Sequence, residues 1–216
     1  MIEKIFFYFF LSHLVGDYVF QTSYIAKYKV SKIPVLFLHV FIIFISMFLI
    51  LLPSSLEPFN ILLLILLTII HLFIDTLKFK NRKKEIFNTH NYYVIDQVMH
   101  LSSLMFISLF YNNTEFLINF DYAKLIAMGL FNAYFIGLFF YVFSKPKKPY
   151  KRDYLGYIFR FSLPFIKFYS NSIFLITSIV FIIISLTLVN KEKENLKSEL
   201  GPLALSIIIT YLSIWR

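Results

Sequence analysis

The chain has 216 residues, of which 59% are hydrophobic and 20% are aromatic. This composition excludes an ordinary soluble domain and indicates an all-α integral membrane protein built as a transmembrane helical bundle. The absence of cysteine excludes disulfides and thiolate ligands, so any metal site must use nitrogen and oxygen donors.

Long apolar stretches predict seven or eight membrane-spanning helices. Each of five clear stretches is long enough to cross a hydrocarbon core of about 30 Å. They lie at residues 3–25, 33–52, 60–79, 92–111 and 123–143. Residues 171–189 predict a further span and 200–215 a weaker one. Residues 154–169 predict either an interfacial helix or a short span kinked at Pro164, with Arg160 and Lys167 on one face.

The formal charge of +9 is distributed as in a membrane protein. Basic residues gather in alternate loops, at 27–32, 78–84 and 145–152, and the loops between them carry acidic residues without lysine or arginine. This positive-inside pattern places the basic loops in the cytoplasm and the N-terminus outside. We therefore expect a multi-pass protein of the plasma (inner) membrane that contacts membrane lipid and binds no nucleic acid.

We expect residues 1–216 to form a single integral membrane domain. Within it, residues 1–111 are predicted to form a four-helix core that carries a polar site, and residues 112–216 to supply accessory spans. The polar residues that motivate this division all lie in the first four predicted spans. The oligomeric state is not indicated by any sequence feature.

Three histidine–aspartate pairs with a spacing of four residues interrupt the first, third and fourth spans. They are His13 with Asp17, His71 with Asp75, and Asp96 with His100. This spacing places both side chains of a pair on one face of an α-helix. The second span adds His39, and counting about 1.5 Å per residue puts all these groups within roughly 20 Å of the cytoplasmic surface. We therefore expect one shared site.

Imidazole and carboxylate groups without sulfur suit a divalent metal, zinc foremost and manganese or iron as alternatives. The predicted metal-binding set is His13, Asp17, His39, His71, Asp75, Asp96 and His100. A structural zinc needs four ligands and a catalytic zinc three plus water, so this set leaves groups for a second metal or for proton transfer. Asp96 is the predicted general base or bridging carboxylate, and Gln21 and Gln97 are predicted to bind substrate.

The favoured function is a membrane-embedded, metal-dependent hydrolase that acts near the cytoplasmic face on a lipid-linked or membrane-peptide substrate. A divalent-cation or proton transporter is the alternative, because intramembrane aspartate and histidine also form ion pathways. Apolar outer halves such as "FIIFISMFLILL" favour the hydrolase. A membrane scaffold for a cytoplasmic partner, and a polar network that only fixes helix register, are further interpretations.

The same motifs occur together in a known family. "LSHLVGDYVFQT", "LHV", "HLFIDTLK" and "IDQVMH" follow one another within residues 11–100. In this order they resemble a family of bacterial polytopic membrane proteins known only as domain of unknown function 3307. The resemblance implies the His/Asp site and brings no established activity. The later segments "DYLGYIFRFSL" and "KSELGPLALSII" are only similar to later parts of the family pattern.

Overall fold

The computed structural model describes residues 2–84, 89–112, 115–144, 153–192 and 196–214, and the regular elements among them are all helices. Four of the described helices are long and apolar enough to cross a membrane. They are Ile33–Ile50, Pro58–Asn81, Phe120–Phe143 and Asn171–Leu188. The all-α class is thus confirmed, and these helices suggest a membrane location. The predicted basic loop at 145–152 lies outside the described residues.

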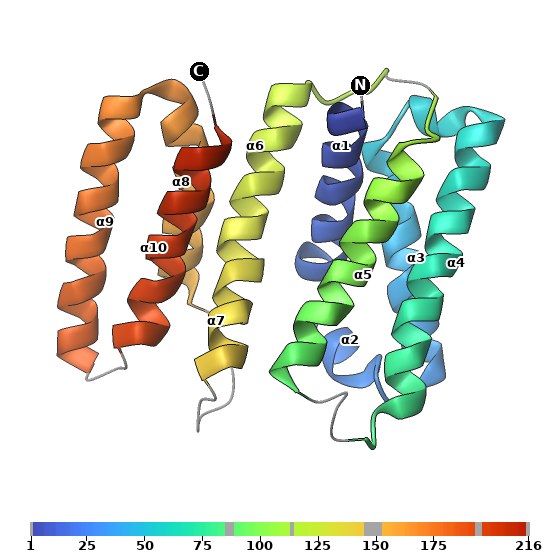
Figure 1. The fold of residues 1–216 in the computed structure, drawn as a ribbon, viewed down its shortest axis with the longest axis horizontal. Helices are drawn as coiled ribbons and strands as arrows, with labels where there is room; N and C mark the ends of the chain where they lie inside the picture. Colours follow the sequence, from blue (N-terminus) through green and yellow to red (C-terminus); the bar gives the residue numbers. More distant parts are fainter. Residues whose placement is uncertain (1, 85–88, 113–114, 145–152, 193–195, 215–216) are drawn as a thin grey trace. The chain divides into compact units, whose positions relative to one another are not determined.

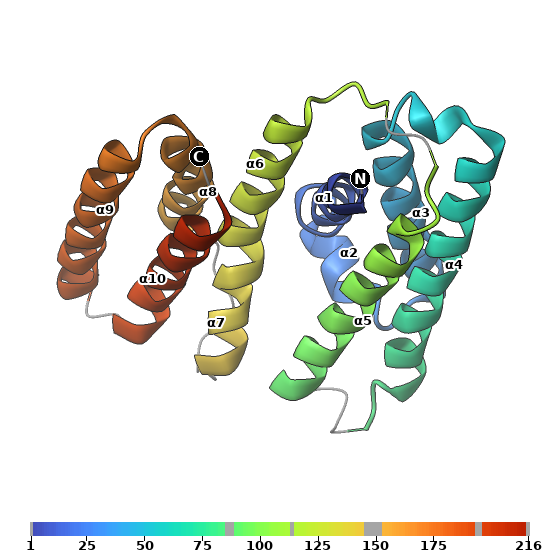
Figure 2. The ribbon, with the colours of Figure 1, turned by 45° about the horizontal axis from the view of Figure 1, so that its top comes forward.

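The chain divides into two compact units, residues 1–124 and 125–216. The main helices of unit 1 are α1 (Ile2–Leu14), α3 (Ile33–Ile50), α4 (Pro58–Asn81) and α5 (His90–Ser108). Both α1 and α4 pack against α3 and α5, so the helices close into a ring, as Figures 1 and 2 show. The apolar side chains of Phe9, Met47 and Leu64 fill the middle of this ring without solvent exposure.

The first predicted span, residues 3–25, is interrupted in the structure. Helix α1 passes into a π-helical turn, η1 (Val15–Val19), and the helical chain then breaks. A separate helix, α2 (Ser23–Tyr28), starts after Thr22, whose hydroxyl accepts a hydrogen bond from the first turn of α2. Such an N-cap satisfies a helix end in spite of a continuous apolar pattern. Single π-helical turns are frequent at functional sites, and this one contains Asp17.

Unit 2 is a second group of packed helices. A long helical segment starts in unit 1 as α6 and continues through η4 and α7, and α8 packs against η4, α9 and α10. The bounds are α6 (Phe120–Leu130), η4 (Phe131–Ile136), α7 (Gly137–Ser144), α8 (Tyr154–Tyr169), α9 (Asn171–Glu192) and α10 (Leu196–Ser213). Leu163, Phe174 and Leu203 form its apolar core.

The basic face of α8 points into unit 2. Arg160 and Lys167 do share a face, but they are only 3% and 9% exposed. The Arg160 guanidinium donates to the backbone carbonyls of Asn132 and Ala133 in η4, at 3.2 Å each. Because buried carbonyls and charges need partners, these bonds explain why this face turns toward the interior of unit 2. The helix continues through Pro164.

Candidate metal centre

The structure brings all three His–Asp pairs and His39 together inside the ring of unit 1. One residue pair comes from α1 and η1, one from α4 and one from α5, while α3 supplies His39. Each of the seven side chains belongs to a residue that is at most 8% exposed. These residues are His13, Asp17, His39, His71, Asp75, Asp96 and His100. We call this set the His/Asp cluster.

The Nε2 atom of His39 is surrounded by polar atoms. Asp17 Oδ1, Asp75 Oδ2 and His71 Nε2 each lie 3.3 Å from it. Lys29 Nζ lies 3.0 Å from the same atom. An imidazole nitrogen carries either one lone pair or one proton, so it makes one in-plane hydrogen bond. Four neighbours cannot all be satisfied by pairing with it. Three of them, the carboxylate oxygens of Asp17 and Asp75 and the His71 nitrogen, are atoms of the kinds that bind a metal ion.

The separations between these donors suit a tetrahedral metal. With metal–nitrogen distances of 2.0–2.1 Å, neighbouring ligand atoms of a tetrahedron are about 3.3–3.4 Å apart. The separation from His71 Nε2 to Asp75 Oδ2 is 3.5 Å, close to this value. Asp17, His39 and His71 form a trio whose ligand atoms all lie within 4.8 Å of one another. This trio, with Asp75 beside it, has the donor types that zinc accepts.

A second trio consists of His71, Asp75 and His100, again within 4.8 Å. Asp75 Oδ2 faces His39 and His71, whereas Asp75 Oδ1 lies 3.6 Å from His100 Nε2. A carboxylate whose two oxygens face different histidines is in position to bridge two metals about 3.5–4 Å apart. The sequence predicted Asp96 as the general base or the bridging carboxylate; in the structure the carboxylate whose two oxygens face different histidines is that of Asp75.

Asp96 lies at the edge of the cluster. Its Oδ2 accepts hydrogen bonds from Lys78 Nζ and Gln97 Nε2, both at 3.3 Å. Its Oδ1 is buried without a hydrogen-bond partner and lies 4.0 Å from His100 Nε2. The carboxylate is therefore held by one oxygen while the other is free to accept a proton, as a general base requires.

Two predicted residues stand apart from the trios. His13 Nε2 lies 3.2 Å from Asp17 Oδ2, the oxygen that does not face His39, so His13 is placed to orient the Asp17 carboxylate without itself belonging to a trio. Gln21 follows η1, and its Oε1 is buried without a hydrogen-bond partner. Among the described residues, no hydrogen bond joins Gln21 to the cluster, whereas Gln97 reaches it through Asp96.

Two lysines belong to the site although the sequence indicated only their place in basic loops. Lys29 Nζ lies 3.6 Å from Asp17 Oδ1, and the Lys78 side chain is 28% exposed beside Asp96. Burial acts to lower the pKa of Lys29, but the carboxylates of Asp17, Asp75 and Asp96 outweigh it and raise that pKa above its usual value. Lys29 is therefore cationic in this arrangement.

Their sequence signals differ. Lys78 follows Asp75 by three residues on α4, a spacing that puts both on one helix face and that the sequence motif contains. Lys29 has no comparable signal. It reaches the cluster because α2 and the turn before α3 fold back toward His39, which sequence spacing does not reveal.

An apolar layer separates the His/Asp cluster from the other end of the ring. Its members are at most 3% exposed: Phe9, Ile43, Met47, Leu64, Leu67 and Leu104. The hydroxyls of Ser12 and Ser46 at this depth donate to carbonyls of their own helices. Beyond the layer, Asn60 donates to the carbonyl of Ser54 at 2.9 Å. The described side chains therefore form no continuous polar path across unit 1.

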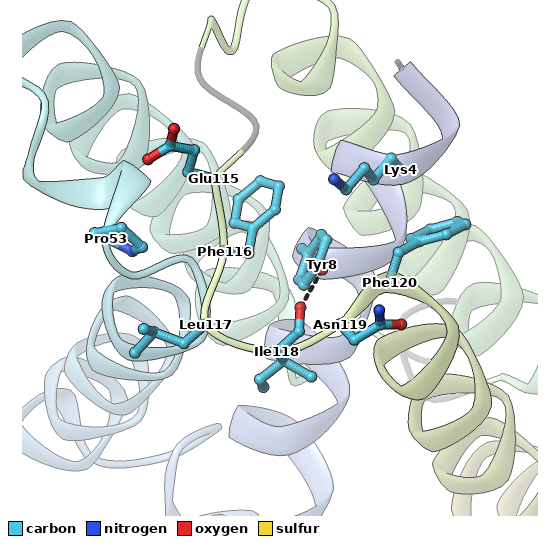
Figure 3. A pocket seen from close by; sticks show the side chains of 9 residues that line it. All are labelled: Lys4, Tyr8, Pro53, Glu115, Phe116, Leu117, Ile118, Asn119 and Phe120. Atoms are coloured by element: carbon cyan, nitrogen blue, oxygen red, sulfur yellow. Dashed lines mark hydrogen bonds between the residues drawn. The ribbon is translucent and has the colours of Figure 1, made fainter.

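A cavity of about 470 Å³ lies at that other end, as Figure 3 shows. Tyr8 stacks on Phe116 at 3.9 Å and donates to the carbonyl of Ile118, and Lys4 and Glu115 supply the charged groups. None of its nine lining residues belongs to the His/Asp cluster. The cavity therefore lies where the start of α1 meets the segments that connect α3 with α4 and α5 with α6, and it is not part of the candidate metal site.

Comparison with known proteins gives one positive finding. A family model described as "Protein of unknown function (DUF3307)" matches residues 5–127. This stretch covers more than half of the chain and contains the whole His/Asp cluster together with both lysines. No curated protein and no solved structure matches the chain.

Proposed function

Because the chain belongs to the DUF3307 family, whose description names no activity, we propose from its site alone a membrane-embedded, metal-dependent hydrolase. The crowding of polar atoms around His39 Nε2 carries the proposal. Buried ionisable groups are costly in a membrane bundle unless each has a partner or together they hold a cation. A divalent metal, zinc foremost, supplies that shared partner.

The charges of the cluster suit such an ion. Asp17 and Asp75 would neutralise one dication, and His39 and His71 would supply nitrogen ligands. Asp96 keeps its own counter-ion, Lys78, at 3.3 Å. His100 and the second oxygen of Asp75 offer room for a second metal. When bound, the metal polarises a substrate oxygen and lowers the pKa of water.

The surplus of groups supports hydrolysis over a purely structural site. Four ligands saturate a structural zinc, and the His/Asp cluster has seven groups, of which Asp96 keeps one unbonded carboxylate oxygen. In the proposed reaction Asp96 removes a proton from the attacking water and Gln97 orients Asp96. The apolar layer beyond the cluster weighs against a conduit, because an ion pathway needs polar groups toward both membrane faces.

We also propose the finer topology: seven or eight spans in the plasma membrane, an external N-terminus, and a site near the cytoplasmic face. Lys27, Lys29 and Lys32 precede α3, and further basic residues follow α4, at the end of the ring that holds the His/Asp cluster. Cysteines introduced as Lys83→Cys and Glu57→Cys into this cysteine-free chain test it. An impermeant reagent should label intact cells only at position 57, and labelling at position 83 contradicts the orientation.

The hydrolase proposal is tested with the purified chain in lipid nanodiscs. Zinc, manganese or iron is added or removed, and turnover of extracted membrane lipids and membrane peptides is followed by mass spectrometry. We expect a product that forms only with metal and that a chelator abolishes. Metal flux into proteoliposomes without turnover would replace the hydrolase by a transporter. If the metal-loaded chain shows no metal flux and no turnover, both functions are contradicted.

A further inference from the structure

Two lysines frame the water-facing edge of the His/Asp cluster. Lys29 Nζ lies near Asp17 and His39, and Lys78 Nζ lies 3.3 Å from Asp96 Oδ2. Their side chains are 19% and 28% exposed, more than the 11% or less of the carboxylates that they contact. Each ammonium therefore touches the cluster on one side and has access to water on the other.

The charge balance of the site changes sign when a metal binds. With Asp17, Asp75 and Asp96 counted as carboxylates, Lys29 and Lys78 as ammonium groups and the histidines without charge, the site has a formal net charge of one negative. One divalent cation turns this into one net positive charge. Opposite charges attract more strongly in a poorly hydrated site than in water, so the metal-loaded site favours an anion.

A cation among the carboxylates also changes what Lys29 can contact. The metal position suggested by the donors adjoins the ammonium, which lies 3.0 Å from one proposed ligand, His39. A cation held by Asp17 and His39 would repel the ammonium that contacts both of them, and the flexible lysine side chain, 19% exposed, can turn outward. Lys29 is then free to bind an incoming anion next to the metal.

Apolar side chains surround the same edge. Val19, Phe20 and Tyr24, where η1 gives way to α2, are 48%, 51% and 53% exposed. Lys32 lies 4.2 Å from the Tyr28 ring centre, and Lys78 lies 5.9 Å from that of Tyr92. Exposed aromatic residues mixed with lysines are typical of the membrane–water interface, where lipid headgroups lie. An anion that reaches the cluster here can remain attached to a lipid.

We propose that the substrate of this site is a phosphate monoester of a membrane lipid and that Lys29 and Lys78 bind its phosphate oxygens; this rests on the hydrolase function proposed above. The scissile groups of peptides and carboxylic esters are uncharged, whereas a phosphate ester carries the negative charge that the site favours. Lysine is a common phosphate ligand in proteins.

The reaction balances with residues of the cluster. Asp96 Oδ1 takes a proton from water, the water oxygen attacks phosphorus, and the bond between phosphorus and the ester oxygen breaks. Asp96 returns the proton to the leaving alkoxide. The products are the lipid alcohol and inorganic phosphate, and no oxidant, reductant or further reactant is needed.

The test uses the metal-loaded chain in nanodiscs with two lipid phosphates, phosphatidic acid and farnesyl phosphate, and with soluble glycerol 3-phosphate. Diacylglycerol and a membrane peptide serve as the controls whose scissile bonds are uncharged. We expect inorganic phosphate from at least one of the two lipid phosphates, at least tenfold faster than from glycerol 3-phosphate. Equal turnover of the soluble ester overturns the lipid part of the proposal. Metal-dependent release of fatty acid or peptide fragments without phosphate overturns the proposed substrate and leaves the hydrolase function intact. If no probe is turned over, both proposals are overturned.

Matched lysine variants separate substrate binding from charge neutralisation. Lys29→Gln and Lys78→Gln should each raise KM for the lipid phosphate about tenfold while metal content stays at the wild-type level. The exposed neighbours Lys27 and Lys80 lie on α2 and α4 and serve as controls, and their glutamine variants should keep the wild-type KM. Unchanged KM in both site variants, with metal bound, would overturn the role assigned to the two lysines.

Discussion

The two units of the chain both bury charged side chains beside a π-helical turn, but they treat them differently. In unit 2, Arg160 donates to two carbonyls of η4 and pairs with Asp153 at 3.3 Å. Lys167 donates to Asn171 and lies 4.6 Å from the ring centre of Tyr211. Each buried cation of that face therefore has its own partners, as a structural role requires.

In unit 1 the polar atoms outnumber the bonds that they can make. His13, His39 and His100 each keep a buried Nδ1 without a hydrogen-bond partner, and Asp75 Oδ2 and Asp96 Oδ1 are in the same position. Among the described residues of unit 2, Asn132 Oδ1 and Ser178 Oγ are such atoms. Buried groups left unpaired in a native fold need an explanation such as an ion or a catalytic role. The contrast indicates a structural role for Arg160 and supports the function proposed for the His/Asp cluster.

The largest effect is expected from Asp75→Ala, which removes the carboxylate that faces both trios. The variant should lose at least nine tenths of the bound metal. It should also lose the stabilisation by bound metal, about 2.7 kcal/mol at a hundredfold excess over Kd. Metal analysis and thermal unfolding measure these effects. Asp121→Ala, an exposed carboxylate in the first turn of α6, is the control and should keep its metal. Full metal content in Asp75→Ala would remove the contrast between the units.

Asp96→Asn sharpens the contrast by separating metal binding from chemistry. The amide is nearly isosteric but cannot accept the proton, so turnover should fall about 10²–10⁴-fold while the fold and most of the metal remain. Turnover assays with metal analysis on the same sample measure both. Asp121→Asn is the matched control. Wild-type turnover in Asp96→Asn would show that this carboxylate is not the base.

Arg160→Met examines the structural side of the contrast. It leaves the buried carbonyls of Asn132 and Ala133 without their donor, which should cost about 2–4 kcal/mol of unfolding free energy. Metal content should not change. Thermal unfolding in detergent checks the first part, with the exposed Arg82→Met as control. Loss of metal together with stability would mean that Arg160 supports the site.

Gly16→Ala should have the smallest effect. A Cβ at Gly16 would lie 2.5 Å from Ile43 Cδ1 and 3.3 Å from Ile43 Cα, so the Ile43 side chain would have to turn away and the backbones of η1 and α3 would be in tight contact. We expect a loss of about 1–2 kcal/mol and a few-fold weaker metal binding, because Asp17 and His39 lie on these two elements. Adding Ile43→Val removes the clashing atom and should restore much of the metal affinity. If a metal titration of the Gly16→Ala variant shows unchanged affinity, the close approach of η1 to α3 is not needed for metal binding.

The sequence predicted the helical class and the seven members of the His/Asp cluster. Apolar runs and the four-residue spacing of the three His–Asp pairs are local features, and His39 was added by its depth in the second span. It did not predict the break after Val19, which depends on the π-helical turn and the Thr22 cap. It also missed Lys29, which the fold-back of α2 carries to the cluster. The inward turn of Arg160 depends on carbonyls of η4, 27 and 28 residues away in the chain. Such contacts are made by tertiary packing and leave no periodic signal.

The most direct test of the central claim is metal analysis of the purified wild-type chain, combined with X-ray absorption at the edge of the metal found. The His/Asp cluster predicts one or two divalent ions per chain, coordinated only by nitrogen and oxygen, with distances of about 2.0–2.2 Å if the metal is zinc. Asp75→Ala should abolish this signal. A folded wild-type chain that holds less than a tenth of an equivalent of any divalent metal after incubation with zinc, manganese or iron would contradict the account. In that case the Lys29 ammonium, and not a metal ion, would be the cation that balances the carboxylates of the cluster.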